Sequence, residues 1–409
     1  MATAYNNEFY YNEALGDDVI ILPEQIKMYK ERVEKIFKFL DTTDDKTQYY
    51  KVLHKKNKDL LIGDNKRLGA ELAKRFKYFV FIGMGGAILN PMMVRSFCGN
   101  VNLLNNTFFI NSTDPLLIKS MLIKVKLEET CFIPISNSGE TTETYTVAKF
   151  LIKKMRDEKI PNFHEHFVFI TANESSRLYK MAAEHSIKTV PYDPDVGGRF
   201  STFSNSAILP AAIMGLDLDG YLDGANSIVD EFWKNRENSR SARAALNMLL
   251  SKKRVIALYT YYSELRPFTE WYAQIISESL GKNKVGYVPF YGVCPMEQHT
   301  SYQYFLDGGN DSLITMIYGE NHSDIKDSDY AELNEVNDKF FKASVEFMQN
   351  QQIPVRTIEL KSYDAYSFGA LLMHCTIEIV FLSLLHEFHP FDQPAMDECK
   401  KFALNKYFA

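Results

Sequence analysis

Hydroxyl side chains gather in one short stretch, residues 130–144, which reads TCFIPISNSGETTET. Its apolar start predicts a buried strand, and the pattern from Tyr145 to Met155 predicts a helix. A turn between a strand and a helix presents unpaired backbone N–H groups, and the helix dipole favours an anion there. The alternative is a polar helix cap, but one cap does not require five hydroxyl residues. We therefore predict that a phosphate group binds to this loop, which carries Ser136, Ser138, Thr141, Thr142 and Thr144.

Later segments carry groups that could stabilise charge or move protons. Arg199 follows two glycines and offers a rigid, permanently charged fork for an anion. Glu278 lies in the last turn of a predicted helix, where the dipole disfavours a negative charge, and this placement suits a general base. His299 could transfer protons near neutral pH. Gln393 and Lys400 are seven residues apart, which places them on one helix face.

Taken singly, each of these residues also has an ordinary structural interpretation. A lone Arg beside a turn, a Glu at a frayed helix end and a Lys on a terminal helix are usually solvated. A lone His is more often structural than catalytic. The Gly83–Gly86 turn allows backbone to approach a ligand closely, or it is only a tight turn after a strand.

Composition limits the class of protein. A length of 409 residues predicts about two domains, and a net charge of −6 argues against a nucleic-acid partner. Five widely spaced cysteines without a CxxC pair suggest neither a disulfide framework nor a zinc site, and they fit a reducing cytoplasm. The N-terminus lacks the pattern of a signal peptide. The apolar stretch Phe368–Leu385 contains His374 and Glu378, so we expect a buried helix and no membrane span.

The elements that must position these residues alternate between strands and helices. Such alternation with apolar strands predicts α/β architecture with mainly parallel sheets, whose ligands bind beyond the carboxyl ends of the strands. The predicted strands are Tyr78–Gly83, Thr107–Asn111, Thr130–Ser136, Phe167–Thr171, Ile187–Pro191, Arg254–Tyr259, Val285–Pro289, Leu313–Tyr318 and Pro354–Glu359. The predicted helices are Tyr29–Leu40, Ala87–Phe97, Asp114–Ile123, Thr141–Met155, Ser175–Glu184, Ala225–Trp233, Phe268–Leu280, Met296–Leu306, Asp329–Gln349, Tyr366–His386 and Gln393–Lys406.

This alternation of strands and helices occurs twice along the chain. We predict a helical arm at 1–60 that wraps the first domain, a first αβα sandwich at 61–220, a second at 221–390, and a C-terminal helix at 391–409 that closes the active site. The sequence does not match three common motifs. In a dinucleotide-binding fingerprint the third Gly would stand at Ile88, and in a P-loop the upstream Gly would stand at Ile276. The GxSxG motif of hydrolases does not occur.

The order of these segments resembles the phosphoglucose isomerase family, which is built from two sugar-isomerase (SIS) domains, and in particular its short bacterial form. The segments are GxGG at Gly83–Gly86, the hydroxyl-rich loop, VGGRxS at Val196–Ser201, ESxGK at Glu278–Lys282, QHxxxQ at Gln298–Gln303 and FDQxxxxxxK at Phe391–Lys400. The resemblance spans most of the chain, and it implies two tandem SIS domains and the interconversion of glucose 6-phosphate and fructose 6-phosphate.

The resemblance also implies residue roles. Glu278 would move a proton between C2 and C1, Arg199 would stabilise the cis-enediol intermediate, and His299 and Lys400 would assist ring opening. Residues implied to hold the substrate are Gly85, Gly86, Ser136, Asn137, Ser138, Thr141, Thr144, Gly198, Gln274 and Gln393. It implies no metal and no organic cofactor, and a homodimer whose partner subunit supplies the histidine.

The chain departs from the family pattern at the phosphate site. Ala87 stands where Ser is frequent, and Asn137 stands where Lys is frequent. We expect weaker phosphate affinity unless Lys149 or another cation compensates. Two carboxylates in the loop, Glu140 and Glu143, must point away from a phosphate.

Two other functions remain open from the sequence. A non-catalytic SIS protein that senses a sugar phosphate would not need Glu278, Arg199, His299 and Lys400 together. A bifunctional glucose/mannose-phosphate isomerase is compatible with the hydroxyl-rich loop, although VGGR and ESxGK favour the monofunctional enzyme.

Overall fold

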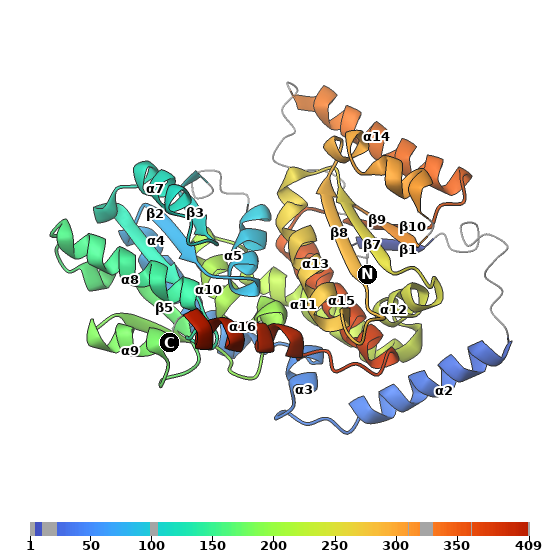
Figure 1. The fold of residues 1–409 in the computed structure, drawn as a ribbon, viewed down its shortest axis with the longest axis horizontal. Coiled ribbons are helices and arrows are strands. Elements are labelled where there is room, and N and C mark those ends of the chain that lie inside the picture. The colour runs from blue at the N-terminus through green and yellow to red at the C-terminus, as the bar shows by residue number, and fades with distance from the viewer. Residues whose placement is uncertain are drawn as a thin grey trace.

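The structure is a computed structural model that describes residues 5–9, 23–98, 105–309, 311–319, 330–360 and 362–407. Two α/β units lie side by side, and the last helix crosses from one to the other (Figure 1). This agrees with the predicted α/β class with mainly parallel sheets flanked by helices. The predicted domain boundaries remain an interpretation of the sequence.

The first unit contains five parallel strands. β3, β2 and β4 form one sheet, β5 and β6 form another, and isolated bridges at Phe132–Phe167 and Ile135–Ile170 connect β4 to β5. The strands are β2 (Tyr78–Ile82), β3 (Thr107–Ile110), β4 (Thr130–Pro134), β5 (Val168–Thr171) and β6 (Lys188–Pro191). The helices are α4 (Lys58–Arg75), α5 (Gly86–Ser96), α7 (Pro115–Lys124), α8 (Thr142–Asp157), α9 (Arg177–Glu184) and α10 (Asn205–Met214).

The second unit contains a five-stranded sheet in the order β1-β10-β9-β7-β8, parallel except for β1. The strands are β1 (Tyr5–Phe9), β7 (Val255–Thr260), β8 (Val288–Val293), β9 (Ser312–Gly319) and β10 (Val355–Leu360). The remaining helices are α2 (Pro23–Leu40), α3 (Gln48–Leu53), α11 (Leu218–Asn235), α12 (Arg240–Leu250), α13 (Arg266–Leu280), α14 (Ala331–Asn350), α15 (Ala365–Leu385) and α16 (Pro394–Tyr407).

Continuous apolar runs explain why the central elements are buried. Every residue of β4 and β9 is buried, as expected for strands covered on both faces. α15 is long and apolar enough to cross a membrane, but 94% of its most apolar window is buried inside the protein. The interpretation of this stretch as a core helix is therefore confirmed.

A fully buried ionic network fastens α13 to the second sheet. Arg356 on β10 donates two hydrogen bonds to Glu378 on α15, at 2.6 and 2.8 Å. The Tyr272 hydroxyl on α13 donates to the same carboxylate at 2.9 Å, and Ser241 contacts His374 at 3.0 Å. Because a buried charge is costly unless it is paired, these bonds hold the two helices and the strand in one arrangement.

Several local predictions differ from the structure. The N-terminal segment contacts both units and not the first alone. β1 pairs with β10, and Arg32 on α2 donates to the carbonyl of Leu385 at 2.7 Å, whereas Lys51 on α3 pairs with Asp193 of the first unit at 3.2 Å. The helix predicted at Met296–Leu306 is two short helical pieces, Met296–His299 and Tyr304–Gly308, because Thr300 leaves the helical region (φ −130°, ψ −84°). β8 begins at Val288, because a turn at 282–285 precedes it.

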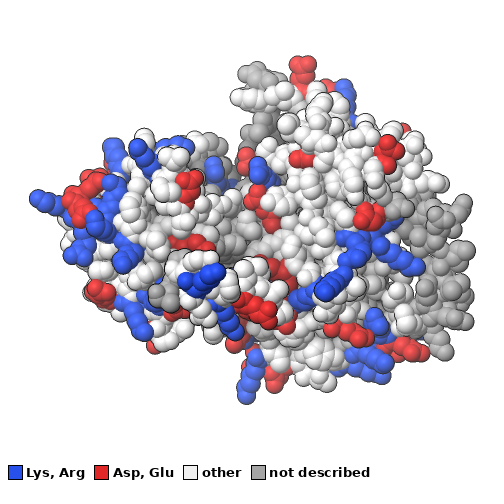
Figure 2. Space-filling view, in the orientation of Figure 1, with Lys and Arg blue, Asp and Glu red and all other residues white. Residues whose placement is uncertain are grey.

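Acidic and basic residues are mixed over much of the face drawn in Figure 2, in keeping with the overall charge of −6. Local features must then supply any attraction for an anionic ligand.

Candidate active site

A cavity of about 850 Å³ brings the predicted site residues together. It lies beyond the carboxyl ends of β2 and β4, where the fold class places ligands. The predicted residues that line it are Gly85, Gly86, Ser136, Asn137, Ser138, Thr141, Gly198, Arg199, Gln274, Glu278, Gln393 and Lys400. Two predicted residues do not line it, namely Thr144 and His299.

The hydroxyl-rich loop folds back on itself between β4 and α8. The Ser136 and Thr141 hydroxyls are 2.9 Å apart, and the backbone N–H of Gly139 donates to the Ser136 oxygen at 3.1 Å. Gly139 has a φ of +65°, which glycine adopts without strain. Thr144 lies in the first turn of α8 and is fully buried, so its hydroxyl faces the packed interior and not the cavity.

The two loop carboxylates behave differently. The Glu140 carboxylate accepts hydrogen bonds from the backbone N–H and the Nε of Arg177, at 2.9 and 2.8 Å. It is therefore held by a cation at the start of α9. Glu143 is exposed and lines the cavity, so its charge stays near any bound phosphate.

Asn137 makes a structural contact in this structure. Its amide donates to the carbonyl of Val196 at 2.8 Å, which ties the hydroxyl-rich loop to the segment that precedes Arg199. Lys149, the cation that we considered as compensation, lines a separate surface cavity with residues of α9. Among the described residues that line the central cavity, Arg199 and Lys400 are the cations.

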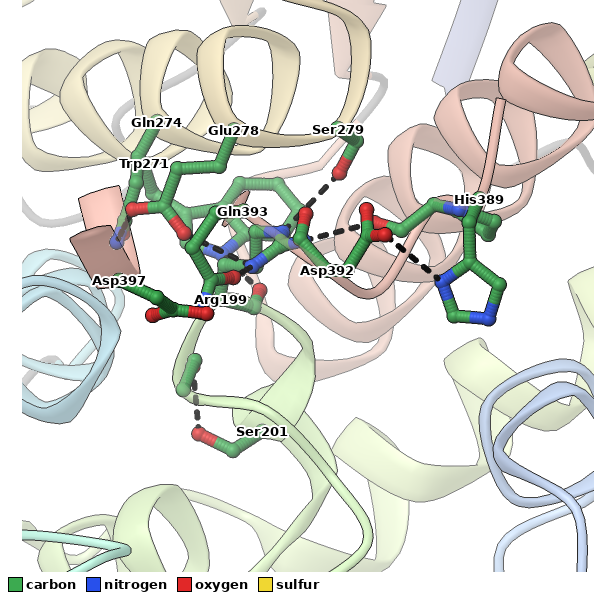
Figure 3. A network of polar contacts seen from close by, with 12 residues as sticks. Arg199, Ser201, Trp271, Gln274, Glu278, Ser279, His389, Asp392, Gln393 and Asp397 are labelled. Atoms are coloured by element: carbon green, nitrogen blue, oxygen red, sulfur yellow. Dashed lines mark hydrogen bonds and ion pairs between the residues drawn. The ribbon is translucent and has the colours of Figure 1, made fainter. Parts of the chain in front are cut away.

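Arg199 is the centre of a polar network that joins three distant parts of the chain (Figure 3). Its Nη1 donates to Glu278 at 2.8 Å and to Gln393 at 2.6 Å. Its Nη2 donates to the carbonyl of Pro390 at 2.7 Å, and its Nε donates to the Ser279 hydroxyl at 3.1 Å. With only 3% of its side chain exposed, the guanidinium is a fixed cation at the cavity wall. Burial lowers the pKa of Arg199 from its ordinary value, and the Glu278 carboxylate opposes this effect.

Both oxygens of the Glu278 carboxylate are oriented. Oε2 accepts from Arg199, and Oε1 accepts from the Gln274 amide at 2.8 Å, one helical turn earlier on α13. The Glu278 side chain is 29% exposed and lines the cavity, so the carboxylate is held in place and is accessible to a ligand. This is the arrangement that a general base requires.

Two glycines allow the two sides of the cavity to approach each other closely. A Cβ atom on Gly86 would lie 2.1 Å from the carbonyl oxygen of Gly198, which is backbone and cannot rotate away. A Cβ on Gly85, where φ is +55°, would lie 2.7 Å from the Gln274 amide nitrogen. Glycine at both positions therefore lets α5 start directly beside Arg199 and α13.

Sequence reasoning missed several residues that hold the network. The Trp271 indole N–H donates to the backbone carbonyl of Arg199 at 2.9 Å. Lys282 binds the Asp392 carboxylate and the carbonyl of His389, which fastens the C-terminal segment to the end of α13. Ser279 and Lys282 both belong to the ESxGK segment, so the motif contained a signal for them. Trp271 had none, because its contact is a tertiary one.

Comparison with known proteins agrees with the geometry. The family model for phosphoglucose isomerase matches residues 41–285, which is more than half of the chain. The chain belongs to the phosphoglucose isomerase family. A glucose-6-phosphate isomerase from Methanocaldococcus jannaschii is 31% identical over 340 residues, covering 80% of this chain and 83% of that protein. The resemblance to this family is therefore confirmed.

Solved structures share the fold. A hypothetical protein from Thermus thermophilus superimposes with a TM-score of 0.82 and 22% identity, covering 98% of this chain and 99% of that one. A glucose-6-phosphate isomerase from Chlamydia trachomatis superimposes with a TM-score of 0.72 and 18% identity, covering 97% of this chain and 77% of that one. At these identities the two likenesses concern the fold, which extends over nearly the whole chain.

Proposed function

We infer that this member of the phosphoglucose isomerase family interconverts D-glucose 6-phosphate and D-fructose 6-phosphate, a step of glycolysis and gluconeogenesis. The observation that carries this conclusion is the Glu278–Arg199 pair in the same cavity as the hydroxyl-rich loop. A protein that only binds a phosphate needs no more than the hydroxyl-rich loop. A carboxylate with both oxygens oriented, beside a fixed guanidinium, is what proton transfer next to a carbonyl needs.

We propose the following division of work between the two sides of the cavity. Ser136, Ser138 and Thr141 hold the 6-phosphate at the start of α8. The substrate then extends toward α13, where Glu278 removes the proton from C2 of the open-chain aldose and returns it to C1. The same carboxylate serves both directions, so the reaction needs no oxidant and no net proton.

Arg199 acts on the charge that develops between these two proton transfers. The enediol intermediate carries negative charge on oxygen, and the fixed positive charge of the buried guanidinium stabilises that charge electrostatically. Nη1 contacts both Glu278 and Gln393, so the positive charge lies beside the proposed base at the cavity wall. Gln393 and Lys400 come from the C-terminal segment, where Lys400 would assist ring opening.

We also propose a homodimer in which each cavity receives His299 from the partner subunit. His299 is exposed and does not line the cavity of its own chain. It follows β8, an edge strand of the second sheet, and large apolar side chains near it are exposed, among them Phe290, Tyr291, Met296 and Tyr304. Such a surface favours burial against another protein.

Hybrid dimers test the shared site. Glu278→Gln and His299→Ala proteins should each be inactive alone, and mixing them should restore part of the activity, since some hybrids contain one intact site. If subunit exchange is demonstrated and no activity returns, each site is built from a single chain.

A coupled assay with two substrates tests the function itself. We expect turnover of fructose 6-phosphate to glucose 6-phosphate without added metal or cofactor, and little turnover of mannose 6-phosphate. Efficient turnover of both sugars would favour the bifunctional enzyme, and binding without turnover would favour a sensor. We place this activity in the cytoplasm.

A further inference from the structure

Arg177, the first residue of α9, contacts the hydroxyl-rich loop and lines a surface cavity other than the central one. Its Nε donates to the Glu140 carboxylate at 2.8 Å, and its Nη2 donates to the Glu140 carbonyl at 2.8 Å and to the Thr142 hydroxyl at 3.3 Å. The guanidinium also lies 4.9 Å from the ring centroid of Tyr145. One side chain thus contacts three residues within a span of six, around the start of α8.

These contacts have two separate effects on the loop. The bonds to the Glu140 carbonyl and to the Thr142 hydroxyl hold the chain on both sides of Thr141, one of the proposed phosphate-binding residues. The bonds to the Glu140 carboxylate hold a negative charge away from the phosphate, in a loop that also carries Glu143. A phosphate site that lacks a lysine at position 137 is sensitive to both effects.

We propose that Arg177 is a positioning residue for substrate phosphate: it orders residues 140–142 and keeps the Glu140 carboxylate turned away from the ligand. The proposal rests on the proposed function, because it assumes that this loop binds the 6-phosphate. Arg177 does not line the cavity itself, so it acts through the loop and not by touching the substrate.

A purely structural role would give a different result. The Arg177 and Glu140 side chains are 42% and 49% exposed, and exposed ion pairs contribute little to stability. Gly139, which precedes the residues that Arg177 contacts, is also held independently, since the N–H of Leu178 donates to its carbonyl at 3.1 Å. Loss of the Arg177 side chain should therefore change ligand binding much more than it changes the melting temperature.

The test compares Arg177→Gln with Arg67→Gln. Arg67 is a matched control, because it is an exposed arginine of the same unit that pairs with one carboxylate, Asp64, at 2.8 Å. We expect Arg177→Gln to raise KM for fructose 6-phosphate about five- to tenfold, as expected when a loop residue must be ordered by the ligand. We expect kcat to change less than KM, and Arg67→Gln to leave both unchanged.

A double variant separates the two effects. In the Arg177→Gln background the Glu140 carboxylate loses the guanidinium and keeps its bond to the backbone N–H of residue 177, so its negative charge is no longer neutralised. Adding Glu140→Gln should then recover part of the lost affinity. Arg177→Lys keeps the charge but loses the fork, and we expect an intermediate KM.

A measurement without turnover keeps the proposal separate from the proposed function. Inorganic phosphate should raise the melting temperature of the wild type and raise that of Arg177→Gln less at the same concentration. Equal protection together with an unchanged KM would overturn the role of Arg177. A wild type that phosphate protects but that does not turn over fructose 6-phosphate would overturn the proposed function alone.

Discussion

Substitution of Gly86 by alanine tests whether the contact between the two glycine loops determines the position of Arg199. The new Cβ would lie 2.1 Å from the oxygen of Gly198, 2.3 Å from its carbonyl carbon and 2.7 Å from the backbone nitrogen of Arg199. All three are backbone atoms, so the clash is relieved only if α5 and the Arg199 loop separate by about 1 Å. A displacement of this size at a catalytic site costs about 100-fold in rate.

The expected cost in stability is smaller than the cost in activity. Overpacking a well-packed site typically costs about 1–3 kcal/mol of unfolding free energy, which a protein of this core size should survive. We therefore expect Gly86→Ala to fold, with a melting temperature lowered by a few degrees. A steady-state assay with fructose 6-phosphate should show the loss mainly in kcat.

Gly197→Ala is the control for the stability of this loop. Gly197 neighbours Gly198, and a Cβ added there would meet no atom within 4 Å. Its φ of −59° is also accessible to alanine. If Gly86→Ala matched the wild type in both melting temperature and kcat, the close approach of the two loops would not control the position of Arg199.

Three further predictions concern other parts of the structure. Asn137→Lys should lower KM for fructose 6-phosphate, because it adds a cation beside the loop hydroxyls, and a KM no lower than that of the wild type would contradict this. Arg356→Met should destabilise the protein by about 3–5 kcal/mol in denaturant unfolding, and Arg356→Met with Glu378→Leu should cost less, since no buried charge is then left unpaired. Burial holds the pKa of His374 well below its ordinary value, so below about pH 6.5 the unfolded chain binds a proton that the folded chain does not. The free energy of unfolding should therefore decrease as the pH is lowered through this range. Denaturant unfolding of His374→Gln should show a flatter decline between about pH 7 and pH 5, and an unchanged slope would contradict the assignment.

The strands of the first unit were predictable because buried strands have a continuous apolar sequence. Continuous apolar runs end at glycine or hydroxyl residues, and the structure places β2 and β4 within the predicted ranges. The hydroxyl-rich loop was predictable for a related reason, because a phosphate site needs hydroxyls and unpaired N–H groups between a strand and a helix. This loop and the Gly83–Gly86 turn follow strands, and the fold brings the ends of parallel strands together. Glu278 and Lys400 lie on helices, and the resemblance to the family identified their roles.

Other elements could not be read from a local pattern. α10 is apolar on all sides and contains Pro210, so it shows no helical periodicity. The partner of β1 lies some 350 positions away along the chain, and no local signal specifies that pairing. The same reason applies to Trp271 and Arg177, since their contacts with the Arg199 loop and the hydroxyl-rich loop exist only in the folded chain.

The measurement that tests the central claim most directly is the rate of isomerisation of fructose 6-phosphate by Glu278→Gln, beside Glu270→Gln. Both glutamates lie on α13 and pair with an arginine, but Glu270 forms its pair with Arg266 and does not line the cavity. The account predicts that Glu278→Gln lowers kcat by about 10²- to 10⁴-fold, the contribution of a general base, and that Glu270→Gln retains the wild-type rate. Wild-type turnover by Glu278→Gln would contradict the assignment of Glu278 as the base.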